Sequence, residues 1–539
     1  MENKRLKLPI GIQTFEKLRK KKCVYVDKTK YLVDLIDNID VSFLARPRRF
    51  GKSLTVSTLE ALLSGKKELF KGLYAEEYMN RLDFTSYPVI RLDMSGATTH
   101  LGIDVIDQSI KQLTIEIADS LDVEVPKELP GSDFFRSLIV NTAKKYNQKV
   151  AVLIDEYDAP YTDFFSEPEM AIKVRNVLRS YYKQLKVTEA HIRFIFITGI
   201  SKFAKLGVFS ALNNTIDISL MPEYAKICGY TEDEIIRYFP DYIDETAKYM
   251  EISPDELIEK MRFYYNGFSF DHTTKTRLYN PFSTLLFFFE KEFFNYWVDT
   301  GRSKIIADYL KDRNLTVEQF RNYPISRDFA KSPGDVDSTT PEGFLYQCGY
   351  LTLRAGTSNT LSLDYPNTEV LNSMSALLTQ NIVSEASYNN IQNILLSALM
   401  YEEIDNLVDV FNRLFASIPY DDFESAGKQS IRTNRYPISV QEWLYRSTLI
   451  AFLRGCGVVV FAEMHTNLGR ADLVISHKSK TWIIEIKVAY KGDSPAKIAE
   501  EAYRQIIDKN YAKPYIDAIC VGMAIDDTLR QITDVKSAN

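Results

Sequence analysis

The sequence is poor in the residues that build disulfide frameworks and soft-metal centres. Its 539 residues include five cysteines and five histidines, with no CxxC spacing and no histidine cluster. An odd number of scattered cysteines supports neither a disulfide framework nor a cysteine zinc site, and it favours a reducing compartment. We therefore expect a cytoplasmic protein whose chemistry depends on other side chains.

Long apolar stretches are also missing. The first residues carry no apolar region of the kind that a signal peptide needs. The longest apolar run, residues 284–298, is interrupted by Glu290, Lys291 and Glu292. It cannot cross a bilayer, so it predicts a buried helix and no membrane partner.

The net charge of −6 argues against a general polyanion binder, but the charge is unevenly distributed. The first 70 residues and residues 431–520 are each basic, whereas the middle of the chain is acidic. Phosphate-bearing ligands are therefore expected near the two basic stretches.

Short apolar runs alternate with helical patterns over the first 220 residues. The runs are continuous, as expected of strands buried on both faces of a sheet, and lie at 41–45, 89–92, 150–154 and 194–197. The helical patterns lie at 54–63, 103–121 and 171–185. This alternation predicts an α/β fold with a parallel sheet, whose ligands bind beyond the carboxyl ends of the strands.

The remainder of the chain divides by pattern. We expect the α/β domain to span 1–224, followed by a mostly helical middle domain over 225–373 and a helical connector over 374–430. A small hairpin is expected at 349–363, and the connector is expected to be two long helices over 374–415. From Pro437 the predicted order is helix, strand, hairpin, helix and strand, in an α/β domain over 431–539.

The segment ARPRRFGKSL follows the first apolar run and precedes a helix, as a phosphate-binding loop requires. Gly51 allows backbone N–H groups to face a phosphate, and the helix adds its positive N-terminal end. Lys52 is expected to reach the β- and γ-phosphates of ATP and Ser53 to bind Mg²⁺. The first glycine of the motif is replaced by Arg46, and the alternative is a basic surface loop. The full predicted binding segment is Arg46, Pro47, Arg48, Arg49, Phe50, Gly51, Lys52, Ser53 and Leu54.

Two further apolar runs end in polar residues. VAVLIDEYD places Asp155 to hold Mg²⁺ and Glu156 to polarise the attacking water, unless both merely cap a strand. Asp158 is interpreted as a second polar contact or a helix cap. FIFITGISKF offers Thr198 as a sensor of the γ-phosphate, with Ser201 and Lys202 nearby.

These motifs together resemble the predicted AAA-ATPase-like family. The resemblance rests on LPIGIQTFEKL, YVDKT, RPRRFGKSL, LIDEYD, FITGISKF, FSALNNTIDISL and ICGYTEDE, and it continues through YYNGFSF, YNPFS, NYWVDTG and LYQCGYL. In that family the first glycine of the loop is usually missing. The resemblance implies a P-loop fold of the additional-strand class.

A second cluster of charge lies near the C-terminus, in GRADLVI, HKSK and TWIIEIKVAY. The pattern predicts a hairpin in which Ile483, Glu485 and Lys487 share one face. Asp472 on the partner strand would come near Glu485, and two carboxylates with a lysine suit a Mg²⁺-dependent attack on a phosphodiester. The alternative is a salt-bridged strand, with Arg470 and Lys487 pairing the two acids.

The spacing of Asp472, Glu485 and Lys487 resembles the PD-(D/E)XK nuclease core, with Ala471 in place of the proline. The resemblance implies that Glu442 supplies a further metal ligand from the first helix. It also places Gln505 on the helix after the hairpin, with Tyr511 nearby; Glu463 is a weaker candidate acid. Degenerate, inactive copies of this core exist.

The favoured function is therefore an ATPase coupled to a nuclease that acts on DNA or RNA, with DNA favoured over RNA as the partner. The expected cofactors are ATP and Mg²⁺, with Mn²⁺ as an alternative at the nuclease site, and a homo-oligomer is compatible with the sequence. The alternative is an ATP-dependent signalling switch whose nuclease-like domain only binds a partner. A third interpretation is a mobile-element accessory protein.

Overall fold

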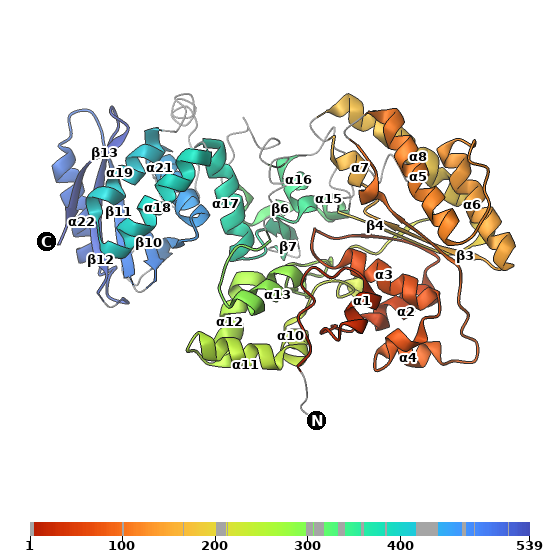
Figure 1. The fold of residues 1–539 in the computed structure, drawn as a ribbon. Coiled ribbons are helices and arrows are strands. Elements are labelled where there is room, and N and C mark those ends of the chain that lie inside the picture. Colours follow the sequence, from red (N-terminus) through yellow and green to blue (C-terminus); the bar gives the residue numbers. More distant parts are fainter. Residues whose placement is uncertain are drawn as a thin grey trace. The chain divides into compact units, whose positions relative to one another are not determined.

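The computed structural model divides the chain into two compact units (Figure 1). Unit 1 comprises Met1–Trp297 and Phe320–Glu369, and unit 2 comprises Val298–Gln319 and Val370–Asn539. The residues that the structure describes are 5–99, 102–164, 167–200, 212, 214–297, 306, 317–331, 340–356, 360–382, 385–416, 440–465, 470–478, 480–515 and 517–538. In that part of the chain, no helix is both long enough and apolar enough to cross a membrane.

Unit 1 is built on a five-stranded parallel sheet, as the alternating pattern predicts. The strand order is β2 (Val89–Asp93), β3 (Val150–Asp155), β4 (Ile192–Gly199), β1 (Val41–Ala45) and β5 (Ile216–Asp217). The strands are continuous apolar runs because helices cover both faces. β4 separates β1 from β3, which is the additional-strand arrangement that the family resemblance implies.

The helices of this domain extend the predicted patterns by a few residues. On one face lie α5 (Ile103–Ser120), α6 (Gly131–Tyr146) and α8 (Pro168–Val187), and on the other lies α3 (Lys52–Leu63) (Figure 1). Shorter helices among the described residues of this domain are α1 (Phe15–Lys20), α2 (Thr29–Asn38), α4 (Tyr74–Met79) and α7 (Ala159–Thr162). The helix α6 has no counterpart among the predicted patterns.

The rest of unit 1 is mostly helical, as expected. Its helices are α10 (Glu232–Tyr238), α11 (Pro240–Tyr249), α12 (Pro254–Tyr265), α13 (Pro281–Glu290), α15 (Arg327–Lys331) and α16 (Pro341–Cys348). The predicted hairpin at 349–363 is present as β7 (Thr352–Ala355) and β8 (Leu361–Asp364), which β6 (Tyr323–Ile325) extends to three strands. The run 284–298 is helical only to Glu290, because Lys291 turns left-handed with a φ of 57°.

Unit 2 holds a five-stranded mixed sheet with helices on both faces. The order is β13 (Gln531–Ser537), β12 (Ile519–Asp526), β11 (Lys480–Ala489), β10 (Arg470–His477) and β9 (Val459–His465). Strands β11 and β12 are parallel and are joined through α22 (Pro495–Asp508), whereas the other pairs are antiparallel. The helices α18 (Glu385–Tyr401), α19 (Ile404–Ala416) and α21 (Val440–Gly455) share the larger core with the sheet.

The prediction of two long helices over 374–415 is wrong in their number. The described residues of this stretch form three helices: α17 (Thr368–Ile382), α18 and α19. The break between α18 and α19 comes at Glu402, whose φ of 62° ends the first helix. The predicted order after Pro437 is confirmed, with β13 added after the last predicted strand. The domain boundaries at 224, 373 and 430 stay predictions.

Candidate functional site

The phosphate-binding segment lies between the carboxyl end of β1 and the start of α3. Gly51 has a φ of 90°, a conformation that favours glycine, and α3 begins at the next residue, Lys52. Lys52 is only 5% exposed, and its Nζ atom donates to the carbonyls of Arg46 at 3.0 Å and Pro47 at 3.1 Å. Burial lowers the pKa of Lys52, while Glu156 and Asp155 oppose this shift. The lysine is thus held across the loop with acids close by.

Asp155 is the best-defined candidate metal ligand. Fully buried at the end of β3, it accepts a hydrogen bond on Oδ1 from the Thr198 hydroxyl at 2.6 Å. The Glu156 N–H donates to the same oxygen at 3.1 Å. Oδ2 is also buried and has no hydrogen-bond partner in the described part of the chain. A buried carboxylate oxygen without a partner is costly, so the geometry fits a Mg²⁺ ion bound directly or through water.

Glu156 lies beside the same lysine in a left-handed backbone conformation, with a φ of 48°. Burial raises the pKa of Glu156, and the neighbouring Asp155 and Asp158 raise it further, while Lys52 and Arg48 lower it. A strained backbone and a carboxyl with a perturbed pKa beside a cation are features that concentrate at functional sites. They suit a residue that polarises water.

Thr198 and Asp158 have structural contacts at the same edge of the sheet. Thr198 positions Asp155 through the bond described above, and its role as a γ-phosphate sensor stays a prediction. Both Asp158 carboxylate oxygens lie 3.2 Å from the Ile200 N–H. Asp158 precedes α7 but its side chain does not cap that helix, so the helix-cap alternative is wrong. Ser201 and Lys202 lie outside the described residues.

Arg46 takes the position of the missing first glycine and anchors the loop. Its guanidinium donates to the carbonyls of Ala45, Ser219 and Tyr224 and lies 4.3 Å from the ring centre of Phe270. The side chain is 1% exposed, and burial lowers its pKa to about 10. Its side chain is therefore committed to backbone carbonyls, and a phosphate contact by Arg48 or Arg49 stays a prediction.

The loop also packs against the helical part of unit 1, which the sequence motifs did not predict. The Phe50 ring lies 4.8 Å from that of Phe268 and 5.0 Å from that of Phe270. A Cβ atom on Gly349 would lie 2.5 Å from Pro47, so only glycine allows that approach. The contacting residues belong to YYNGFSF and LYQCGYL, two of the motifs that carry the family resemblance. The presence of these two motifs in the family pattern was the sequence feature that could have indicated this contact.

Arg49 and Trp297 extend this contact. Arg49 Nη1 donates to the Tyr296 carbonyl at 3.2 Å, and its guanidinium lies 4.0 Å from the ring centre of Phe282. The Trp297 indole donates to the Arg48 carbonyl at 3.4 Å. Burial raises the pKa of Glu369 to about 8, and the charge of Arg49 opposes this shift from longer range.

In unit 2 the predicted hairpin brings Asp472 and Glu485 together. The register pairs Leu473 with Ile484, which sets these two acids opposite each other. The Asp472 N–H donates to Glu485 Oε2 at 3.2 Å, and Asp472 Oδ2 accepts from the Ile486 N–H at 3.0 Å. Ile484 and Ile486 lie in the larger core and Ile483 lies in the smaller one, which confirms the predicted facing of this strand.

The two carboxylates already have protein partners. Arg446 of α21 forms an ion pair with Asp472 Oδ1 at 2.9 Å, with side chains 6% and 11% exposed. The Gln505 amide of α22 donates to Glu485 Oε1. The helix approaches this closely because Gly522, paired with Glu485 on β12, lacks a Cβ that would lie 2.3 Å from the Tyr503 nitrogen. Sequence reasoning placed Gln505 correctly on that helix and missed Arg446.

The described residues of this hairpin do not form a complete metal centre. Within the described chain, no group of three or more His, Cys, Asp or Glu side chains is placed to hold a metal ion. The side chains of Glu442, Glu463 and Arg470 lie outside the described residues. Arg446 supplies positive charge beside Asp472. Lys487 is partly exposed on the predicted strand, and Tyr511 is a buried core residue at 2% exposure.

Comparisons with known proteins agree with this division of sites. The family described as predicted AAA-ATPase matches residues 9–209, and the PD-(D/E)XK nuclease superfamily matches residues 440–534. A protein of Azotobacter chroococcum mcd 1, described as "Uncharacterized protein in vnfD 5'region", is 33% identical over 518 residues. The match covers 95% of this chain and 94% of that protein. The chain belongs to the predicted AAA-ATPase family and carries a PD-(D/E)XK nuclease superfamily domain.

The chain also matches solved structures. The ORC2 protein of Aeropyrum pernix, determined as ADPNP–ADP complexes, matches 70% of this chain and 97% of its own at 12% identity. Its TM-score of 0.26 is too low to support a conclusion about this protein.

Proposed function

We propose that this protein binds and hydrolyses ATP in unit 1 and uses the nucleotide to control a nucleic-acid-cleaving domain in unit 2. The observation that carries the first half is the buried, unpartnered Oδ2 of Asp155 close to Lys52 and Glu156. Mg²⁺, when bound there with ATP, would neutralise charge on the phosphates. Ser53 and Asp155 would hold the ion, Lys52 would contact the β- and γ-phosphates, and Glu156 would orient the attacking water.

The ATPase proposal is tested by two substitutions with matched controls. Lys52→Ala is expected to abolish hydrolysis and weaken ATP binding, whereas Glu156→Gln should keep binding and lose turnover by about 100-fold or more. The exposed Lys71→Ala and Glu167→Gln are the controls. Hydrolysis by Glu156→Gln at the wild-type rate would remove the proposed role of Glu156.

The nuclease half rests on the juxtaposition of Asp472 and Glu485 on one face with Lys487. In this proposal Lys487 steadies the charge that develops on the phosphate, and Gln505 orients Glu485. The test is cleavage of DNA and RNA with Mg²⁺ or Mn²⁺, comparing Asp472→Ala with the exposed control Asp508→Ala. Cleavage that survives Asp472→Ala would assign the activity to another site or a contaminant.

A second candidate function is a switch whose unit 2 binds a partner without cleaving it. The observation that favours it is the buried Arg446–Asp472 ion pair, which places an arginine cation on one of the two carboxylates that a metal ion would need. Arg446→Gln distinguishes the two. If Arg446 only blocks a metal site, the substitution should create or raise metal-dependent cleavage; if unit 2 is a binding domain, no cleavage should appear.

Coupling between the sites is proposed to pass through the points where the chain leaves unit 1. Two of its crossings to unit 2 follow Trp297 and Glu369, and the Trp297 N–H donates to Glu369 Oε1 at 2.8 Å. Trp297 also contacts the Arg48 carbonyl of the phosphate loop. A nucleotide that prefers one arrangement of the loop can therefore bias both exit points.

The coupling test compares wild type, Lys52→Ala and Asp472→Ala in cleavage and ATP hydrolysis. Coupling predicts that Lys52→Ala alters cleavage and that Asp472→Ala leaves hydrolysis largely intact. Equal cleavage by wild type and Lys52→Ala, with and without ATP, would show two independent modules.

A further inference from the structure

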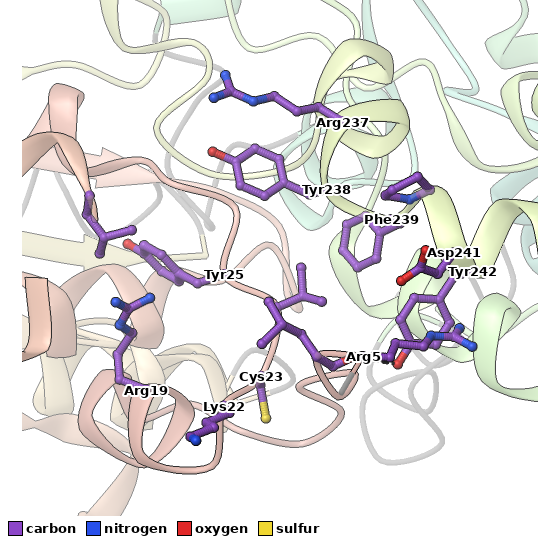
Figure 2. Close-up of a pocket in the computed structure, with 14 residues that line it drawn as sticks. Arg5, Arg19, Lys22, Cys23, Tyr25, Arg237, Tyr238, Phe239, Asp241 and Tyr242 are labelled. Carbon is purple, nitrogen blue, oxygen red and sulfur yellow. Dashed lines mark hydrogen bonds between the residues drawn. The ribbon is translucent and has the colours of Figure 1, made fainter. Parts of the chain in front are cut away.

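A pocket of about 560 Å³ opens in unit 1 among residues that play no part in the two sites above (Figure 2). Its wall combines the N-terminal arm, the end of α1 and the turn between α10 and α11. Arg5 closes one side, because it pairs with Glu245 and stacks 3.1 Å above the Tyr242 ring. The Tyr242 hydroxyl in turn donates to the Leu6 carbonyl at 2.9 Å. We call it the N-terminal pocket; its volume is in the range of small-molecule sites.

Positive charge dominates this wall. Arg19, Lys22 and Arg237 line it together with one acid, Asp241. The Arg19 guanidinium donates to two uncharged carbonyls, those of Leu69 at 2.8 Å and Lys71 at 2.6 Å, so it is held in place with its charge intact. Within the described chain, no carboxylate forms an ion pair with any of these three cations. The pocket therefore has unneutralised charge for an anion.

One aromatic ring in the wall is available to a ligand. Phe239 stacks on Phe288, with ring centres 5.5 Å apart, and the face of Tyr242 is covered by Arg5. The ring of Tyr25 pairs with that of Phe15, with ring centres 5.0 Å apart. Tyr238 is half-buried and packs partly against the neighbouring apolar core, but no other aromatic ring of the described chain stacks on it. Arg237 lies 5.4 Å from its ring centre. Figure 2 shows Tyr238 between Arg237 and Tyr25.

We propose that the N-terminal pocket binds a nucleotide unit, with its phosphate on Arg19, Lys22 and Arg237 and its base stacked on Tyr238. Cations beside an accessible aromatic ring are the combination that recognises a phosphate and a base together. The same chemistry is presented by a free nucleotide and by one residue of a single-stranded nucleic acid. The inference goes beyond the proposed function, because it needs neither hydrolysis at Lys52 nor cleavage at Asp472.

The experiment uses the full chain carrying Lys52→Ala, so that the phosphate loop does not mask the pocket. Binding of ATP and of a fluorescent oligo(dT) of about 12 nucleotides is measured separately at fixed salt. Lys22→Glu, Arg237→Glu and Tyr238→Ala should each weaken binding about tenfold, which corresponds to about 1.4 kcal/mol. Tyr238→Phe keeps the ring, and Lys248→Glu is an exposed control outside the pocket; both should bind normally.

The two arms identify the source of the nucleotide unit. Weakening for ATP as well as the oligonucleotide assigns the pocket to free nucleotide, and weakening for the oligonucleotide alone assigns it to single-stranded nucleic acid. If both ligands bind all three pocket variants as tightly as they bind Lys248→Glu, the proposal is wrong. Failure of ATP hydrolysis or of cleavage in the wild type would leave these binding results unchanged.

Discussion

The two candidate sites both contain buried carboxylates, yet they differ in how those carboxylates are satisfied. Among the described residues of unit 1, Asp155 keeps one buried oxygen without a partner, beside a lysine whose hydrogen bonds go to backbone carbonyls. In unit 2, the oxygens of Asp472 and Glu485 all have protein partners, among them the Arg446 cation.

The difference separates a site prepared for a ligand from one that is stable without it. An unpaired buried oxygen raises the free energy of the protein until a cation or water arrives, so ligand binding is favoured. A buried ion pair must be broken before a metal can bind Asp472, and breaking such a pair is expensive. We therefore expect nucleotide binding in unit 1 to need little rearrangement and metal binding in unit 2 to need movement of Arg446.

The largest expected effect on stability comes from removing Arg446, the cation that pairs with Asp472 in unit 2. Arg446→Ala leaves the Asp472 carboxylate buried without its cation and should lower the free energy of unfolding of unit 2 by about 3–5 kcal/mol. Denaturant unfolding measures this loss. The double variant Arg446→Ala/Asp472→Ala should recover part of the lost free energy of unfolding, because it no longer buries an unpaired carboxylate. A loss below about 1 kcal/mol would show that the pair is not what stabilises the hairpin.

A smaller effect, on nucleotide affinity, is expected from neutralising Asp155 in unit 1. Asp155→Asn removes the charge that holds Mg²⁺ and should weaken Mg²⁺–ATP binding about 100-fold, or about 2.7 kcal/mol. Stability without nucleotide should change little, because the substitution keeps the shape and removes an unpaired buried charge. Calorimetric titration and thermal unfolding measure the two quantities, with exposed Asp119→Asn as the control. Equal nucleotide affinity in both variants would contradict the assignment.

Glu369 is a further buried carboxyl, and its effect on stability depends on pH. Burial raises the pKa of Glu369 from 4.5 to about 8, so the folded protein retains a proton that the unfolded chain loses. Its contribution to stability is fully present below pH 4.5 and is lost as the pH rises through 8, by about 1.4 kcal/mol per pH unit. Glu369→Gln should remove this slope. Identical pH profiles of unfolding for the variant and the wild type would mean that Glu369 titrates normally.

The smallest expected effect concerns the contact between the phosphate loop and the helical segment. Arg49→Ala removes the guanidinium from above Phe282 and its hydrogen bond to the Tyr296 carbonyl, which should cost about 1 kcal/mol of stability. Arg49→Lys keeps the charge and should recover part of the loss. If Arg49→Ala unfolds at the wild-type temperature, this contact does not hold the loop.

The sequence predicted the elements of unit 1 better than their arrangement. The strand 41–45 was predictable because it is a continuous apolar run followed by a phosphate-loop motif, and the additional-strand class followed from family resemblance. Apolar periodicity carries no information on which strands are neighbours, so β4 between β1 and β3 could not be derived from the runs themselves. Similarly, Asp472 and Glu485 could be predicted because side chains alternate between the two faces of a strand, so the sequence shows which residues share a face. Arg446 was missed because a helical arginine gives no local sign of a partner 26 residues away.

The packing of Phe50 and Pro47 against Phe268, Phe270 and Gly349 has a practical consequence for fragments of this protein. The match to the predicted AAA-ATPase family ends at residue 209, yet the residues that pack against the phosphate loop lie within 268–350. A fragment cut at the family boundary would expose that apolar surface and invite aggregation. The smallest stable fragment that keeps the phosphate loop packed should therefore extend to Glu369, because the loop and the helical segment behind it form one folding unit.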